Sequence, residues 1–254
     1  MAKTDIATKG TTALAHASTF EEDASDGFKN MGQEDFALPF LRLLTNTSPE
    51  VGEVDGALPG MIFNTVSGGL YDGKKGITVI PCAYVRNYLE WSPRGSGSGA
   101  PIVHPATSDI MSRTHKEPGD SKDYLSNGNY IENTANHYVM VVNDDGIPEP
   151  ALITMKSTQL KKSKKWNSMM MTTKLMGKNG PYTPPMYSHV YRLSTVPESN
   201  DKGKWFGWEI SRIGPIEDIG QYAVAKAFAA QIGAGEVKVK HHDEAAVAEE
   251  NIPF

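Results

Sequence analysis

The sequence predicts a mainly β protein with a few helices, and three observations lead to this prediction. Stretches in which apolar and polar side chains alternate recur along the chain, and the longest of them is GITVIPCAYVRNYLEWSP at residues 76–93. Turn sequences rich in Gly, Asp, Asn and Pro separate these stretches. Two other segments have the apolar spacing of amphipathic helices. With 254 residues and 39% hydrophobic side chains, the chain is long enough for one core with tails.

We expect three parts along the chain. Residues 1–30 are rich in Ala, Thr, Ser and Asp, which predicts a flexible N-terminal arm. Residues 31–235 contain the apolar segments and form the predicted folded domain. Within it, residues 94–128 are rich in Gly, Ser and Pro and predict a long loop or insertion. Residues 236–254 predict a disordered acidic C-terminal tail.

The first part of the folded domain predicts short elements and one long strand. Residues 34–51 place apolar side chains around Pro39, which favours a short helical or extended segment. Residues 59–76 predict two short strands around a Ser-Gly-Gly turn. In residues 76–93, one face of the strand would present Ile77, Val79, Ala83, Val85 and Leu89, and the other Thr78, Ile80, Cys82, Tyr84, Arg86 and Tyr88.

Two strand pairs and a helix follow further along the chain. Residues 137–156 predict a hairpin around an Asp-Asp-Gly turn. Residues 181–196 and 203–216 predict two aromatic-rich strands, in which Trp205 and Trp208 point to opposite faces, so that at most one lies in the core. Residues 217–233 predict a helix that ends at Gly233 and places Val224, Phe228 and Ile232 on one side.

Basic charge is concentrated in residues 151–180, although the whole chain has a net charge of −5. This segment contains seven lysines, and nothing between Glu149 and Glu198 is acidic. Its middle predicts an amphipathic helix with Ser157 as N-cap and Gly177 as the stop. An ordinary surface helix would explain a solvated lysine face, but such helices usually mix Glu with Lys. The missing acidic residues favour a phosphate-binding surface.

The predicted basic helix has two distinct arcs. At 100° per residue, the inward arc contains Leu160, Ser163, Trp166, Asn167, Met170 and Met171. The opposite arc contains Lys161, Lys162, Lys164, Lys165 and Ser168.

Tyr84, Arg86 and Tyr88 alternate on one strand face, a pattern that suits base stacking with phosphate contact. Packing of the tyrosines against a neighbouring strand would explain it equally. We take the aromatic residues as candidates for stacking, any of which would instead belong to the core: Tyr84, Tyr88, Trp166, Tyr187, Tyr191 and Trp208. The candidate phosphate-binding residues are Lys156, Lys161, Lys162, Lys164, Lys165, Lys174, Lys178, Arg86 and Arg192.

Several functions find no support in the sequence. No phosphate-binding Gly-rich loop, zinc-protease motif or nucleophile elbow occurs, so we expect no enzyme, no cofactor and no metal site. His104, His115 and Asp120 lack metal-ligand spacing. The single cysteine, Cys82, is expected in the core, and the chain has neither a secretory signal nor an 18-residue apolar run. These features predict a protein of a reducing cytoplasm.

The order of the predicted elements is similar to that of an oligonucleotide/oligosaccharide-binding (OB) barrel. That fold has five strands, often with a helix between the third and the fourth, and the predicted basic helix lies at that point. The resemblance implies an OB-fold-like five-stranded barrel with a long inserted loop and flexible termini.

The C-terminal sequence EENIPF resembles the acidic tip of bacterial single-stranded-DNA-binding proteins, which ends in Asp residues followed by Ile-Pro-Phe. In those proteins the tip docks replication partners. The resemblance implies a partner-docking role for Glu249, Glu250, Ile252, Pro253 and Phe254. The chain departs from the pattern because Glu and Asn replace the run of Asp.

Segments within residues 31–235 resemble phage-encoded single-stranded-DNA-binding proteins, among them LPFLRLLTNTSPEV, PGMIFNT and YDGKKGITVIPCAYV. The resemblance implies sequence-independent binding of single-stranded DNA during phage replication, recombination or repair. It also implies replication proteins as tail partners, a possible homodimer and the cytoplasm of the infected host. Three alternatives stay open: a β-class virion or assembly protein, a strand-annealing recombination protein, and a nuclease or other enzyme.

Overall fold

The fold is that of a computed structural model, which describes residues 20–32, 35–93, 99–201, 203–237 and 239. The chain divides into two compact units, Met1–Phe36 and Ala37–Phe254. In the first unit the described residues form a short helical turn followed by turns with mostly exposed side chains. Most of the predicted arm and most of the predicted tail lie outside the described residues.

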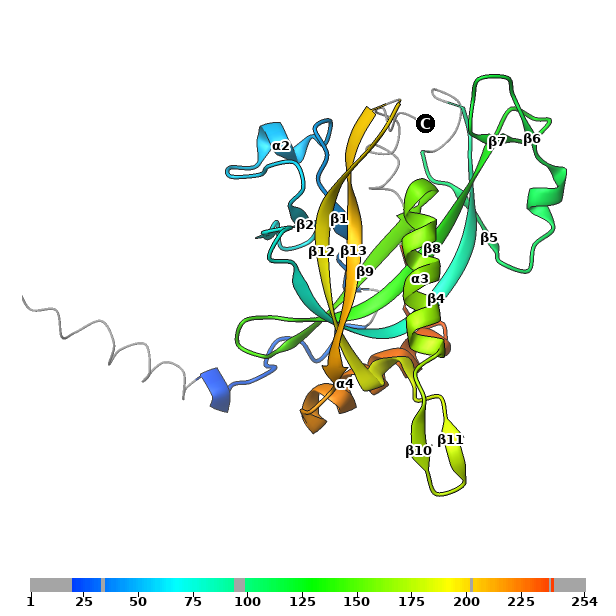
Figure 1. The fold of residues 1–254 in the computed structure, drawn as a ribbon. Coiled ribbons are helices and arrows are strands. Elements are labelled where there is room, and N and C mark those ends of the chain that lie inside the picture. Colours follow the sequence, from blue (N-terminus) through cyan, green and yellow to red (C-terminus); the bar gives the residue numbers. More distant parts are fainter. Residues whose placement is uncertain (1–19, 33–34, 94–98, 202, 238, 240–254) are drawn as a thin grey trace, which may run out of the picture. The chain divides into compact units, whose positions relative to one another are not determined.

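The second unit is built around one antiparallel sheet of order β13-β12-β4-β8-β7-β6, in which β5 also pairs with β4 and β9 with β8. Figure 1 shows that this sheet is strongly curled, like half of a barrel. The prediction of a mainly β protein with a few helices is confirmed. The long strands are β4 (Ile77–Trp91), β8 (Tyr130–Val142), β9 (Pro148–Lys156), β12 (His189–Asn200) and β13 (Gly203–Pro215).

Strand β4 confirms the clearest prediction from the sequence, but a bulge changes its faces. The register between β4 and β8 shifts between Pro81 and Ala83, where proline, which has no N–H to donate, is tolerated. After this shift Tyr84 and Arg86 point to the same side as Val79, because their partners in β8 alternate without interruption. The predicted single alternation across the whole strand was therefore wrong.

Two apolar clusters cover the two faces of the curled sheet. The inner one gathers side chains of β4, β8, β9, β12 and β13 around Trp166 and Met170 of helix α3 (Leu160–Met171). The outer one packs Ile80 and Cys82 against Phe228 of helix α4 (Ile219–Gly233). Cys82 is buried as predicted, and burial raises the pKa of its thiol to about 12.

Helix α4 confirms the predicted helix, and Phe228 and Ile232 pack on the outer cluster as predicted, whereas Val224 does not. Asp218 caps it by accepting a hydrogen bond from the Gln221 amide at 2.9 Å. Ala225 and Phe228 face the sheet, whereas Val224 is 44% exposed. The helix is rotated so that the small Ala225 allows close approach to the sheet.

Helix α3 is present where the sequence predicted it, but its ends differ. Ser157 does not cap the helix; it begins a 3₁₀ turn (Ser157–Gln159) with a positive φ of 49°. The helix ends at Met171, and Gly177 belongs to a hairpin that the sequence analysis did not predict. The strands of that hairpin are β10 (Leu175–Gly177) and β11 (Gly180–Tyr182).

The long strands follow one another in the sheet as β13-β12-β4-β8-β9, with α3 between β9 and β12 in the chain. However, more strands are present than the predicted five. Within the described residues, β9 and β13 do not pair. Strand β1 (Leu41–Leu43) lies beside both, and Phe40 forms a parallel bridge to Leu152 of β9. The described residues therefore form a curled half-barrel, and the five-stranded OB barrel stays a prediction.

A small second sheet, ordered β1-β2-β3, follows the predicted short segments. Strands β2 (Ile62–Asn64) and β3 (Leu70–Tyr71) pair around the predicted turn, in which Asn64 Oδ1 accepts hydrogen bonds from two backbone amides. A one-turn helix, α2 (Glu50–Glu53), lies between β1 and β2 in the chain.

The predicted long loop is a structured insertion in its described part, residues 99–128. It contains β5 (Ile102–Pro105), a 3₁₀ turn (Ile110–Arg113), β6 (His115–Lys116) and β7 (Asp123–Tyr124). Ile110 and Leu125 pack with Tyr88 and Ile131 in a separate small core. This core explains how a Gly- and Ser-rich segment is ordered.

We expect Gly73→Ala to lower the free energy of unfolding by about 1–3 kcal/mol. An added Cβ would overlap the Gly60 carbonyl oxygen and the Thr195 hydroxyl, which form a 2.6 Å hydrogen bond. The Gly73 carbonyl also accepts from the Thr195 amide at 2.8 Å, which holds this turn against β12. Urea denaturation would measure the change. Gly52→Ala is the control, because its Cβ would meet nothing within 4 Å, and an equal loss in both variants would contradict the prediction.

Candidate nucleic-acid interface

Helix α3 is fixed on the sheet by a stack of rings. Trp166 is fully buried, and its ring stacks on His137 of β8 with centroids 4.5 Å apart. Tyr191 of β12 meets Trp166 edge-on at 5.8 Å. Ser163, one turn before Trp166, lies 2.8 Å from His137 Nε2. Ser163, Trp166 and Met170 of the predicted inward arc therefore face the core, whereas Met171 of that arc is 66% exposed. Burial lowers the pKa of His137 to about 3.

Most of the aromatic residues predicted to stack on bases belong to the core. Trp166, Tyr191 and Trp208 are each at most 3% exposed, so none offers a ring face to a ligand. Tyr88 is buried in the small core of the insertion. Tyr187 is half-buried and packs edge-on against Tyr222 of α4. Trp166, Tyr191, Trp208 and Tyr88 are therefore core side chains, the alternative that the sequence left open for each of them, and Tyr187 is half-buried. Alternation and helical spacing do not distinguish a core ring from an exposed one.

Tyr84 is the aromatic candidate that keeps an exposed surface. Its side chain is 36% exposed, and its ring lies against His137 with centroids 5.1 Å apart. His137 in turn stacks on Trp166, so the His137 ring lies between Tyr84 and helix α3. Arg86, two residues along β4, is exposed and donates a hydrogen bond from Nε to Asn133 at 3.0 Å. Of the predicted tyrosine–arginine stripe, Tyr84 and Arg86 are therefore accessible and Tyr88 is not.

Three of the seven lysines have acidic partners from distant parts of the chain. Lys156 pairs with Glu132 at 3.1 Å. Lys162 pairs with Glu198 at 2.9 Å, and Lys165 with Glu209 at 3.4 Å. The segment lacks acidic residues in sequence, but the fold supplies them from β8, β12 and β13. Only part of its positive charge is therefore available to a ligand.

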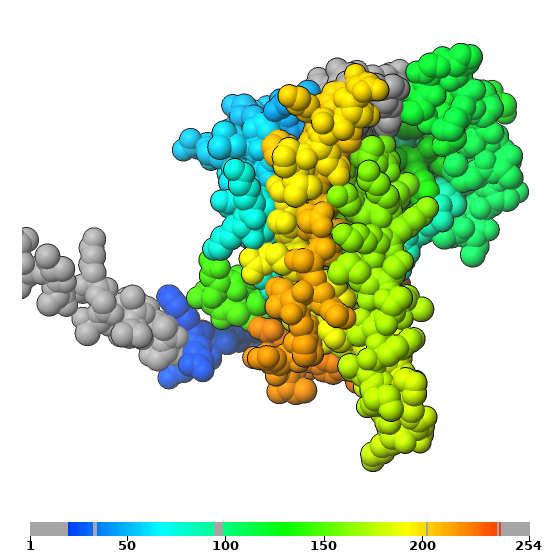
Figure 2. All heavy atoms as spheres, viewed as in Figure 1, coloured from blue at the N-terminus to red at the C-terminus, as the bar shows by residue number. Residues whose placement is uncertain are grey.

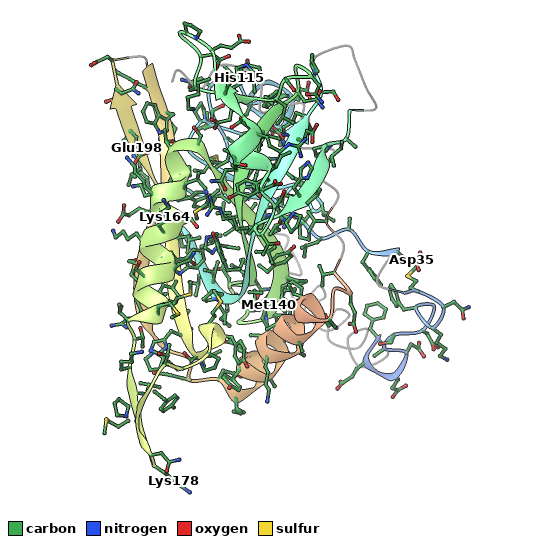
Figure 3. The ribbon with its side chains drawn as sticks, turned by 90° about the vertical axis from the view of Figure 1, so that its right-hand side faces the viewer. Asp35, His115, Met140, Lys164, Lys178 and Glu198 are labelled. Carbon is green, nitrogen blue, oxygen red and sulfur yellow. The ribbon has the colours of Figure 1, made fainter. Side chains whose placement is uncertain are left out.

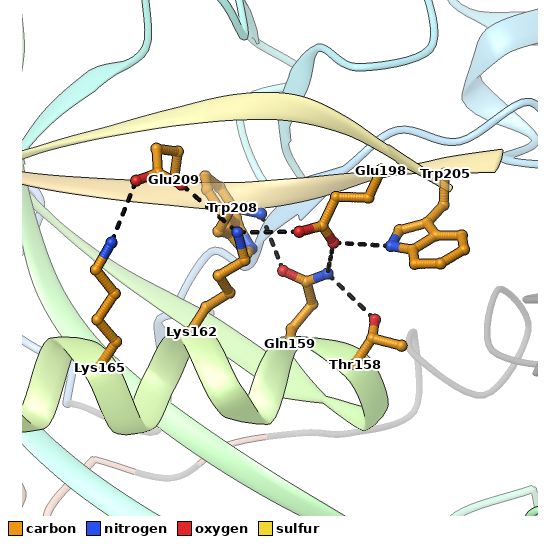
Figure 4. Close-up of polar contacts among 8 residues, drawn as sticks. All are labelled: Thr158, Gln159, Lys162, Lys165, Glu198, Trp205, Trp208 and Glu209. Atoms are coloured by element: carbon orange, nitrogen blue, oxygen red, sulfur yellow. Dashed lines mark hydrogen bonds and ion pairs between the residues drawn. The ribbon is translucent and has the colours of Figure 1, made fainter. Parts of the chain in front are cut away.

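The partners of Lys162 form a polar cluster between α3 and the β12–β13 pair, shown in Figure 4. Glu198 Oε2 accepts hydrogen bonds from Trp205 Nε1 at 2.9 Å and from Gln159 Nε2 at 3.4 Å. Gln159 Oε1 accepts a hydrogen bond from the Trp208 backbone N–H at 2.9 Å, so this N–H of strand β13 has a partner. A Cβ at Gly207 would overlap the Glu198 carboxylate. The cluster therefore fastens the start of α3 to the sheet.

The charges in this cluster stabilise each other. Burial alone would raise the pKa of Glu198, but hydrogen bonds from Lys162, Trp205 and Gln159 outweigh it and lower the pKa. Burial likewise would lower the pKa of Lys162, but Glu198 and Glu209 outweigh it and raise the pKa. Lys162 therefore fastens α3 to the sheet, and its contact with a phosphate stays a prediction.

We expect Glu198→Gln to lower the free energy of unfolding by about 1–3 kcal/mol at neutral pH, because it removes a charged hydrogen-bond acceptor that is largely buried. Since the folded-state pKa of Glu198 is lowered, this contribution is lost as the pH falls through that pKa, and the variant and the parent should converge in acid. Glu209→Gln is the matched control: its side chain is 41% exposed and its ion pairs are longer, so its effect should stay below about 1 kcal/mol.

Lys161 and Lys164 face solvent on α3 and form no ion pair with any described residue. By helical phase, Lys162 and Lys165 turn toward β13, whereas Lys164 turns away from it. Figure 3 shows Lys164 on the outer side of the helix. We call Lys161, Lys164, Tyr84 and Arg86 the lysine ridge. It combines free positive charge with one accessible ring.

The remaining predicted cations lie elsewhere. Lys174 and Lys178 are exposed in the β10–β11 hairpin, with Lys178 at its tip in Figure 3. Lys174 donates a hydrogen bond to Thr183. Arg192 donates to the Lys75 carbonyl at 3.0 Å and alternates with the buried Tyr191, so it lies on the face of β12 away from the inner core. Arg192 is therefore not part of the ridge.

The predicted partner-docking residues Glu249, Glu250, Ile252, Pro253 and Phe254 lie outside the described residues. Within the described part of the chain, no three His, Cys, Asp or Glu side chains gather as metal ligands would. His104 lies 2.7 Å from Glu90 instead. No helix among the described residues has the length and apolar character needed to span a bilayer.

One set of accessible residues was not predicted from the sequence. Leu175, Met176 and Tyr182 are large apolar side chains of the hairpin that are 39%, 80% and 48% exposed. The Gly-Lys-Asn-Gly sequence at residues 177–180 is a two-residue hairpin turn, and this turn is the feature of the sequence that indicates the hairpin.

The fold and this surface define a mainly β protein with an exposed basic helix face. The chain belongs to the Pam3 phage gp34-like protein family, whose sequence profile matches residues 7–238. Its membership indicates a phage protein, in agreement with the phage resemblance found in the sequence. Comparisons with curated proteins and with solved structures give no match.

Proposed function

We propose that this protein binds single-stranded DNA without sequence preference and acts in phage DNA replication, recombination or repair. The observation that supports this most is the lysine ridge. In a chain with a net charge of −5, Lys161 and Lys164 are exposed on α3 and form no ion pair with a described residue. A polyanion is the ligand that such unpaired charge favours.

The composition of the ridge favours a single strand over a duplex. Unstacked bases present their faces to aromatic rings, and each such contact stabilises binding by about 1–3 kcal/mol in known cases. Tyr84 is 36% exposed, and Arg86 adds a planar cation two residues along the same strand. None of these contacts reads a base edge, so we expect little sequence preference.

The order of the long strands adds support from the fold. In an OB barrel the first strand pairs with both the second and the fourth, and β4 pairs in the same way with β8 and β12. We therefore propose that the half-barrel is a modified OB fold in which β1 stands between β9 and β13. We further propose that the acidic C-terminal tip recruits replication proteins, as its resemblance implies.

The test is a titration of labelled oligo-dT and of a duplex of equal length, followed by fluorescence anisotropy at two salt concentrations. The label belongs on the DNA, because Trp91, Trp166 and Trp208 are buried and their fluorescence is not expected to report binding. The proposal expects tight, salt-sensitive binding that prefers the single strand. Negligible binding to both DNAs would overturn it and favour an assembly protein. Metal-dependent cleavage of either DNA would favour a nuclease.

A further inference from the structure

The β10–β11 hairpin is an extension of helix α3 that projects away from the sheet (Figures 1 and 2). Leu175 pairs with Tyr182 and Gly177 with Gly180, so the turn consists of two residues, Lys178 and Asn179. The base of the hairpin is anchored, because Arg212 of β13 donates a hydrogen bond to Thr173 at 3.0 Å. Its orientation is thus fixed at the base while its strands remain exposed.

The hairpin presents apolar side chains to water. Met176 is 80% exposed, Tyr182 48% and Leu175 39%, and Met171 at the end of α3 is 66% exposed. Leu175 and Tyr182 are cross-strand partners on one face of the hairpin, whereas Met176 lies on the other face. Exposed large apolar side chains on one projecting element mark an interaction site rather than ordinary surface. Neither the core nor the fold explains why these side chains are apolar.

Tyr182 is held in a fixed place on the hairpin. A Cβ at Gly177 would lie 3.1 Å from the Tyr182 ring, so the ring lies across the backbone of the opposite strand. Glycine permits this contact because it has no side chain there. One side of the ring rests on Gly177, and the rest is exposed to solvent. A ring ordered in this way can stack on a planar ligand with little further loss of conformational entropy.

The charge of the hairpin indicates what kind of planar ligand it would bind. Lys174 and Lys178 are exposed and form no ion pair with a described residue. No acidic residue occurs between Glu149 and Glu198, so nothing on the hairpin repels an anion. A ligand that carries both negative charge and flat apolar groups would satisfy the lysines and the apolar side chains together. Single-stranded nucleic acid has that chemistry.

We propose that the β10–β11 hairpin binds single-stranded DNA, with Tyr182 and Leu175 contacting bases and Lys174 and Lys178 contacting phosphates. This inference rests on the proposed function and extends its site. The hairpin continues the line of Lys161 and Lys164 beyond the C-terminal end of α3, as Figure 3 shows for Lys164 and Lys178. Twelve residues of helix and the strands of the hairpin together give a basic path of roughly 30 Å.

The test uses the full-length chain and two probes of equal length, oligo-dT and an abasic strand that keeps the phosphates. We expect the double variant Leu175→Ala, Tyr182→Ala to bind oligo-dT about 5- to 100-fold more weakly than the parent, as loss of base stacking predicts. Its affinity for the abasic strand should equal that of the parent. Since both side chains are exposed, its melting temperature should be unchanged.

The matched control is Ile102→Ala, Val103→Ala, which removes two exposed apolar side chains from β5. We expect it to leave both affinities unchanged. A DNA strand that contains 5-iodouracil should photo-crosslink to residues 175–182 of the parent protein. If the parent binds oligo-dT and the hairpin variant binds it equally well, the hairpin inference is overturned and the proposed function stands. If the parent binds neither probe, both fail. Loss of self-association in the hairpin variant with unchanged DNA affinity would overturn the inference and assign the hairpin to a protein contact.

Discussion

Replacing Lys161 and Lys164 with Ala should weaken binding of single-stranded DNA by about 10- to 100-fold at low salt. Both lysines are exposed and have no acidic partner among the described residues, so each is free to neutralise a phosphate and release its counterion. The plot of log affinity against log salt should lose about 0.7 in slope for each lost contact, which is about 1.4 for the pair. Anisotropy titrations of oligo-dT over a range of salt concentrations would measure both quantities.

The matched control for this pair is Lys75→Ala with Lys226→Ala. Both lysines are exposed, one on the turn before β4 and one on α4, and their removal changes the net charge by the same amount. If the two double variants lose the same affinity, binding depends on total charge and the lysine ridge is not the site. Lys162 and Lys165 are unsuitable as a control, because Lys162 is bound to Glu198 and its loss would disturb the attachment of α3.

The stability of the protein should fall as the pH decreases from about 7 to 5, and His137 should be the main cause. In the unfolded chain its imidazole takes up a proton near pH 6.5, whereas in the folded protein burial lowers the pKa to about 3. Between these values the unfolded state binds more protons, so the free energy of unfolding decreases as the pH falls. The free energy of unfolding changes by at most about 1.4 kcal/mol per pH unit for one proton. His137 therefore lowers the free energy of unfolding by about 2 kcal/mol between pH 7 and pH 5.

His137→Gln removes this titration while keeping a polar group that can bond to Ser163. We expect the variant to be less stable at neutral pH, because the ring stack with Trp166 is lost, but to show a much flatter dependence on pH. A small slope should remain, since burial and the charge of Arg212 lower the pKa of His189 in the same direction. Urea denaturation at several pH values would measure the slopes. Equal slopes in the parent and the variant would show that another group controls the acid sensitivity.

Strands and helices with a strong local pattern could be predicted from the sequence. The alternation in residues 76–93 gave β4, the Asp-Asp-Gly turn gave the β8–β9 hairpin, and helical spacing gave α3 and α4. The prediction of at most one core residue among Trp205 and Trp208 was also correct, since Trp208 is buried and Trp205 is half-buried. These features depend on neighbours within a few residues, which is the range over which periodicity acts.

The candidate site was predicted less well, and the reason differs between its charges and its rings. The lack of acidic residues in 151–180 suggested that all its lysines were free, but Glu132, Glu198 and Glu209 reach three of them from other strands. The rings of Trp166 and Tyr191 match a stacking pattern, yet they face each other in the core. Such contacts join residues that lie tens of positions apart, and no local pattern reports them.

The sequence by itself determined the mainly β class, the positions of the long strands and the concentration of lysines on one amphipathic helix, because each follows from local spacing of side chains. Only the tertiary structure decided which cations and which rings remain accessible. Lys161, Lys164 and Tyr84 face solvent, whereas Lys162 and Trp166 are held against the sheet. The physical reason is that burial and ion pairing depend on which strands pack against the helix. Those strands are distant in the sequence, so the spacing of neighbouring residues does not report these contacts.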